Sequence, residues 1–212
     1  KNKTMKKIFV AVILLSTLQG WANKLSVSTP QELVKTGIQA KAGDTVVIKN
    51  GNYTNCNLII SAKGTARQPI VFMAHVPGGV VFTGNSYLHI TGTYITVTGV
   101  VFKDGYAGKN QFVFGLRDPY AADQSGSKAF ENDSYLSGTN SGLLTDTLAT
   151  KAIFSNVTVV GPLVSPTSTA FDPQFIAAVH TRRGSAQSIL NSVIIGWPVG
   201  MLLDESSSSY GS

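Results

Sequence analysis

Short runs of β-branched and aromatic residues recur in the first half of the chain, and turns rich in Gly, Asn or Pro separate them. The six runs are Val46–Ile48, Leu58–Ile60, Ile70–Phe72, Val80–Phe82, Tyr94–Val97 and Val100–Phe102. No run is long enough for a helix, so each predicts a short β-strand. Strands this short at this spacing indicate a chain that coils rather than one that forms a meander.

One helix is predicted ahead of these strands. The segment Thr29-Pro30-Gln31-Glu32 combines an N-cap residue, a proline suited to the first helical position and a glutamate that can bond back to the cap. An apolar face follows at Leu33, Val34 and Ile38, and Gly37 and Gly43 limit the helix to about three turns. We expect this helix to cover the open end of a stack of β-coils, whose edge would otherwise expose unpaired backbone groups.

The second half of the chain contains a repeated pattern. Asn156–Pro162 and Asn191–Pro198 both read Asn-x4-Gly followed closely by Pro, 35 residues apart. A period of about 20 to 50 residues is typical of stacked repeats, and asparagine tolerates the left-handed conformation and can bond along a stack. We therefore expect one all-β domain over residues 23–212, with capped first coils at 23–107, a loop-rich excursion at 108–150 and further coils at 151–212.

The first 22 residues have the form of a bacterial secretory signal. Four lysines precede the short apolar stretch Phe9–Leu18, and Gly20-Trp21-Ala22 offers small residues for cleavage after Ala22. The apolar stretch is too short to span a membrane, and the rest of the sequence shows no candidate span. The predicted location is secreted, periplasmic or cell-surface.

Removing this segment changes the charge of the chain. Lys+Arg falls from 17 to 13 against 11 Asp+Glu, so the formal net charge falls from +6 to +2 and gives no case for nucleic acid. Residues 23–103 hold seven Lys/Arg and two Asp/Glu, whereas residues 104–212 hold six and nine. A basic first half suits a polyanionic partner, although a solvated surface is the simpler explanation of scattered charges. Cys56 is the only cysteine, which excludes an internal disulfide.

Two arginines near a histidine are the main candidates for binding chemistry. Arg182 and Arg183 follow His180 closely, and paired guanidinium groups can grip a carboxylate or sulfate, while an imidazole can exchange protons. The alternative is a solvated turn before Gly184. Five acidic residues could in principle hold Ca²⁺, but their spacing matches no calcium-binding motif, so no metal ligand is assigned: Asp118, Asp123, Glu131, Asp133 and Asp146.

The order of motifs in the first half resembles the N-terminal end of the chondroitinase B and alginate lyase family. Five segments carry the resemblance, which covers about residues 26–107: Thr29–Leu33, Ala42–Tyr53, Lys63–Ile70, Val80–Gly84 and Gly99–Gly105. The resemblance implies a right-handed parallel β-helix, a solenoid with a short N-terminal capping helix. It also implies β-elimination on uronate polysaccharides, with Ca²⁺ as a possible cofactor, a lysine base and an assisting arginine.

The catalytic and calcium-binding residues of that family lie downstream of the matched region, so none is carried onto this chain and the catalytic residues stay unknown. The segments Gly115–Pro119, Ala122–Ser127 and Phe130–Asp133 resemble secreted bacterial β-helix proteins of unknown function. Arg117, in the first of them, joins His180, Arg182 and Arg183 as a candidate substrate-binding residue.

Three hypotheses remain open from the sequence. The first is a secreted monomer that binds or cleaves an acidic polysaccharide, and the second is a non-catalytic surface or adhesion module. The third is an inactive fragment of a longer enzyme, because the apolar stretch Val199–Leu203 is followed only by a polar tail without a cap.

Overall fold

A computed structural model describes residues 22–103, 112–116, 127–133, 151–173, 175–182 and 186–204. The predicted signal, apart from Ala22, lies outside these residues. The described chain is all-β except for one helix, α2 (Pro30–Gln39). Its strands are β1 (Lys24–Val27), β2 (Thr45–Ile48), β3 (Gly51–Thr54), β4 (Asn57–Ile60), β5 (Ile70–Ala74), β6 (Val80–Thr83), β7 (Tyr87–Ile90), β8 (Ile95–Thr98), β9 (Val100–Phe102), β10 (Phe112–Leu116), β11 (Ser127–Asp133), β12 (Lys151–Ser155), β13 (Thr158–Val160), β14 (Phe175–Arg182), β15 (Ala186–Leu190), β16 (Val193–Ile195) and β17 (Val199–Asp204).

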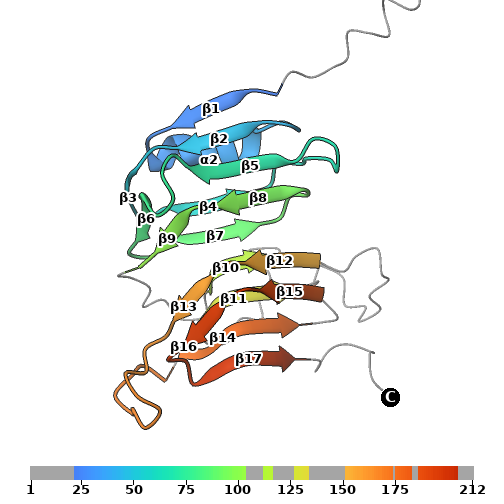
Figure 1. The fold of residues 1–212 in the computed structure, drawn as a ribbon. Helices are drawn as coiled ribbons and strands as arrows, with labels where there is room; N and C mark the ends of the chain where they lie inside the picture. Colours follow the sequence, from blue (N-terminus) through green and yellow to red (C-terminus); the bar gives the residue numbers. More distant parts are fainter. Residues whose placement is uncertain are drawn as a thin grey trace, which may run out of the picture.

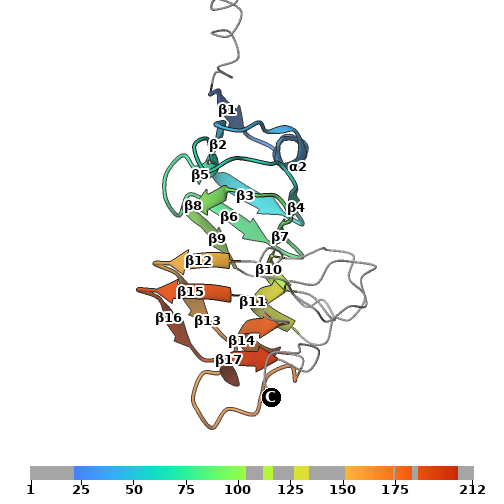
Figure 2. The same ribbon diagram turned by 90° about the vertical axis from the view of Figure 1, so that its right-hand side faces the viewer.

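The strands lie one after another along the molecule and form narrow parallel sheets (Figure 1). In the first half the chain passes in turn through a four-stranded sheet (β1-β2-β5-β8), a three-stranded sheet (β3-β6-β9) and a six-stranded sheet (β4-β7-β10-β11-β14-β17). In the second half the pairs β12-β15 and β13-β16 precede β14 and β17 in the same alternation. Figure 2 shows the six-stranded sheet along one side, with β8, β12 and β15 along the other.

The sequence predicted the central part of this arrangement well. All six expected strands between residues 45 and 105 are present, as β2, β4, β5, β6, β8 and β9. Two strands, β10 and β11, lie within the segment 108–150, which the sequence analysis assigned to a loop-rich excursion. β10 and β11 both insert into the six-stranded sheet, where Phe114 pairs with Leu88 on one side and Phe130 on the other.

Helix α2 begins as predicted and packs against β4. Thr29 Oγ1 accepts from Glu32 N (3.2 Å), and the Glu32 carboxylate accepts from Thr29 N, completing a capping box. Leu33 is fully buried, while the backbone of Gly37 approaches β4 so closely that a Cβ there would lie 2.7 Å from the carbonyl oxygen of Ile59. The expectation that Ile38 belongs to the apolar face was wrong: its side chain is 61% exposed.

The interior is filled by every second residue of the strands, since side chains alternate across each pleat. The larger core cluster includes Val46, Phe72, Phe82 and Leu88, all at most 2% exposed. Phe82 stands between Tyr53 and Phe102 in register, with ring centroids 5.5 Å and 4.7 Å away. Each such buried aromatic side chain stabilises the fold by about 3–5 kcal/mol relative to alanine.

The repeated asparagines turn the chain between adjacent strands. Asn156 and Asn191 both adopt positive φ (56° and 45°), and Asn191 Nδ2 donates to Asn156 Oδ1. The strands that follow them pair in register, with Thr158 opposite Val193. The 35-residue period is therefore confirmed as a structural one in the described part of the chain.

Candidate functional site

His180 lies on the outer face of the six-stranded sheet. Its neighbour Val179 belongs to a smaller apolar cluster of the interior, and successive side chains of a strand point to opposite faces. His180 is nevertheless only 4% exposed. The registers of β14 with β11 and with β17 place Glu131 and Leu202 opposite it.

The same row of the sheet contains a second histidine. His89 of β7 pairs with Gly115 of β10, which pairs with Glu131 of β11. His89 is 7% exposed, and the Tyr87 ring stacks on it with centroids 4.4 Å apart. The backbone registers therefore bring His89, Glu131 and His180, from three distant segments, into one row of the sheet.

Arg182 lies two residues after His180 on β14. The strand registers place Asp133 of β11 and Asp204 of β17 opposite it. This register could not be predicted from the sequence, because the two aspartates are far from Arg182 along the chain.

The positions of the remaining candidate residues relative to these two rows are not described. Arg117 and Arg183 lie outside the described residues, as do Asp118, Asp123 and Asp146. Among the residues that the structure does describe, no group of three or more His, Cys, Asp or Glu could hold a metal ion. The described residues thus supply no calcium site.

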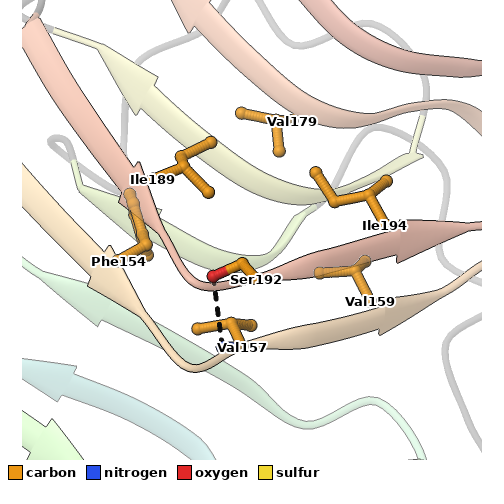
Figure 3. Close-up of a pocket in the computed structure, with 7 residues that line it drawn as sticks. All are labelled: Phe154, Val157, Val159, Val179, Ile189, Ser192 and Ile194. Atoms are coloured by element: carbon orange, nitrogen blue, oxygen red, sulfur yellow. Dashed lines mark hydrogen bonds between the residues drawn. The ribbon is translucent and has the colours of Figure 1, made fainter.

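A small cavity lies inside the second half of the molecule (Figure 3). Its volume is about 10 Å³, and six of its seven lining residues are apolar: Phe154, Val157, Val159, Val179, Ile189 and Ile194. The seventh, Ser192, accepts a hydrogen bond from Val157 N at 3.2 Å. A space this small and apolar holds at most one water molecule, so this cavity is a packing gap and not a ligand site.

Two reactive or sugar-stacking side chains have structural roles instead. Cys56 is free and buried, and burial raises its pKa to about 11, which keeps the thiol protonated and unreactive at neutral pH. Trp197 packs edge-on against Phe175, with centroids 5.9 Å apart, beside the smaller core cluster. Trp197 is therefore part of the packing of this half of the molecule.

Comparison with known proteins bears on the first half of the chain. Residues 27–125 match the Chondroitinase B family model. The match confirms the resemblance drawn from the motifs and extends past residue 107, where those motifs end. No curated protein sequence matches the chain.

The fold is similar to that of alginate lyases of polysaccharide lyase family 6. The lyase AlyGC superimposes with a TM-score of 0.52 at 23% identity, over 75% of this chain and 21% of its own. The lyase Pedsa3628 from Pseudopedobacter saltans (16% identity, 84% and 41% coverage) and a mannuronic-acid-specific lyase from human gut microbiota (18%, 76% and 36%) both give 0.49. The chain thus spans about a fifth of the length of AlyGC, and identities this low show a shared fold only.

The described residues include no helix that is both long and apolar enough to cross a membrane.

Proposed function

We propose that the chain is a right-handed parallel β-helix of the polysaccharide lyase type, with α2 as its cap. The parallel registers and the repeated order of the sheets support this, as does the similarity to AlyGC. The position of α2 also supports it, because β4 is the end strand of the six-stranded sheet and α2 packs on it. Backbone N–H groups of Ser61 and Ala62, just after β4, donate to the carbonyl oxygen of Gly37.

The proposed activity is binding or cleavage of an acidic, uronate-containing polysaccharide by an exported monomer. The observation that carries it is the match of residues 27–125 to the Chondroitinase B family. Cleavage would proceed by β-elimination: a base removes the proton from the carbon next to the uronate carboxylate, the C–O bond to the neighbouring sugar breaks as the double bond forms, and the departing sugar oxygen takes up a proton.

The outer face around His180 and Arg182 is the proposed place of binding. A guanidinium group can hold a uronate carboxylate through two parallel hydrogen bonds, whereas His180 is only 4% exposed and can support such a contact only from beneath the surface. Arg117 and Arg183 are close in sequence to strands of this face and are proposed to add positive charge. No step is assigned to Ca²⁺.

The direct test is incubation with alginate, chondroitin sulfate and dermatan sulfate, each with and without calcium. The proposal of cleavage expects rising ultraviolet absorbance from the unsaturated product on at least one substrate, and loss of that signal in Arg182→Ala. Absence of product from every uronate polymer would contradict cleavage.

The alternative is a non-catalytic surface module, which needs only exposed cations and aromatic side chains. Binding of the polysaccharides without unsaturated product would support this alternative. If neither binding nor product is observed, the third hypothesis remains, which is a fragment without activity of its own.

A further inference from the structure

Three turns lie one above another where the chain enters the four-stranded sheet. The turn 41–44 precedes β2, the turn 63–69 precedes β5 and the turn 91–94 precedes β8. Gly43 N donates to Gln68 O (3.1 Å) and Gly64 N to Thr93 O (2.8 Å), so each turn is bonded to the next. Figure 1 shows the connection into β5 extending beyond the ends of β2 and β8. We name this surface the turn edge.

Tyr94 of the turn edge has a conformation that is unusual for its residue type. Its φ is 52°, whereas the other non-glycine residues with positive φ in the described chain are all asparagines: Asn55, Asn156 and Asn191. A bulky side chain in the left-handed region is sterically costly, and such outliers often mark functional positions. The Tyr94 ring is also 58% exposed, so burial in the core does not explain why an aromatic residue occupies this position.

Backbone contacts explain the left-handed conformation of Tyr94, but they do not explain why the residue carries an aromatic ring. The carbonyl oxygen of Tyr94 accepts from Ile70 N (3.0 Å), and a Cβ at Gly64 would lie 2.8 Å from the same oxygen. The close packing of the two turns thus fixes the left-handed geometry. Asparagine or glycine would satisfy it with less strain, which leaves the exposed ring to be explained by contact with a ligand.

The three turns also carry positive charge. Lys41, Lys63 and Arg67 belong to the same three turns, and all three are exposed. The only two acidic residues between positions 23 and 103 are engaged by backbone groups. Glu32 accepts from Ser28 and Thr29 at the start of α2, and Asp44 is buried and accepts from Asn23 N and Lys41 N.

We propose that the turn edge is a second binding site for an acidic polysaccharide, separate from the face that carries His180 and Arg182. Tyr94 offers an exposed aromatic surface on which a sugar ring can stack, while Lys63, Arg67 and Lys41 bind carboxylate or sulfate groups of the same chain. The choice of a saccharide over another polyanion rests on the proposed function. The site would hold a long polymer away from the outer face of the six-stranded sheet.

The test compares charge-matched variants by affinity electrophoresis in gels that contain alginate or chondroitin sulfate. Lys63→Ala/Arg67→Ala removes two charges from the turn edge. Lys35→Ala/Lys49→Ala removes two exposed charges elsewhere in the same half: Lys35 lies on α2, and Lys49 follows the opposite end of β2. We expect affinity about five- to tenfold weaker in the first variant and less than twofold weaker in the second. Equal losses in the two variants would overturn the proposal.

Tyr94→Asn separates recognition from folding, because asparagine accepts the left-handed backbone. We expect this variant to be at least as stable as the wild type in urea but to bind several-fold more weakly. Unchanged binding would contradict a stacking role for the ring. If both turn-edge variants lose affinity for single-stranded DNA but bind saccharides as the wild type does, the choice of a saccharide as the ligand is overturned.

Failure of this proposal can be told apart from failure of the proposed function. If the wild type and the turn-edge variants cleave alginate equally well and bind it equally well, only the proposed binding site at the turn edge is contradicted. A wild type that binds through the turn edge without releasing unsaturated product contradicts only cleavage.

Discussion

At the scale of single residues, the structure depends on positions where a side chain satisfies an unusual backbone or burial demand. Asn156 and Asn191 take left-handed φ at equivalent turns and bond to each other, as the sequence pattern predicted. Cys56 fills the interior, and its amide N–H donates to Ser86 Oγ at 2.9 Å. The identity of each residue follows from local geometry.

Replacement of Asn191 tests the turn. Asn191→Ala loses the side-chain bond and places an alanine at positive φ, so we expect a loss of about 1–2 kcal/mol in the free energy of unfolding. Asn191→Gly loses only the bond and should lie between the alanine variant and the wild type. Urea titration measures both, and an alanine variant as stable as the glycine variant would contradict the argument.

Burial of Cys56 predicts a dependence of stability on alkaline pH. The thiol has its ordinary pKa of 9.0 when unfolded and about 11 when folded, so above pH 9 the unfolded state releases the proton first. The stabilising contribution is complete below pH 9 and is lost as pH rises to 11, on the order of 1–2 kcal/mol. The difference in stability between wild type and Cys56→Ala should shrink over that interval; a constant difference would contradict it.

At the scale of elements, each strand is short and is held by neighbours far away in sequence. Helix α2 has a different basis, because its start is fixed by the local capping box while its position depends on the contact between Gly37 and β4. Alanine is a better helix former than glycine by about 1 kcal/mol, but here a Cβ would meet the Ile59 carbonyl oxygen at 2.7 Å. Tertiary packing therefore outweighs helix propensity at this residue.

Gly37→Ala should consequently destabilise the protein by about 1–3 kcal/mol despite its gain in helix propensity. Gln39→Ala, an exposed position near the end of the same helix, provides the control and should change stability by less than about 0.5 kcal/mol. Thermal denaturation followed by circular dichroism compares the two. A Gly37→Ala variant more stable than the wild type would show that α2 does not dock as described.

Strands could be predicted from the sequence where one face is continuously apolar, and they could not be predicted where polar residues interrupt that face. β1, β3, β7 and β11 were not predicted, since charged or polar residues interrupt them, as in the sequence Gly51-Asn52-Tyr53-Thr54 of β3. The residues of the candidate site could also be predicted only in part. His180 and Arg182 could be named from their residue types. Asp133 and Asp204 could not, because the register of distant strands decides which residues lie in one row of the sheet.

At the scale of the whole molecule, the distribution of charge and the fold support a polyanionic partner. Residues 23–103 carry an excess of five positive charges, and the two acidic residues among them are bound to backbone N–H groups. Exposed charges act over about 10 Å at 0.1 M salt, so binding by this half should weaken steadily as salt is added. The parallel stack offers a long, regular surface on which a polymer could lie.

The most direct measurement of the central claim is the mobility of the folded protein in native gels that contain a dissolved polysaccharide. We expect strong retardation by alginate or chondroitin sulfate at low salt, relief of that retardation at about 0.5 M salt, and none by neutral dextran. Equal mobility in acidic and neutral polysaccharides would contradict both cleavage and binding of an acidic polysaccharide.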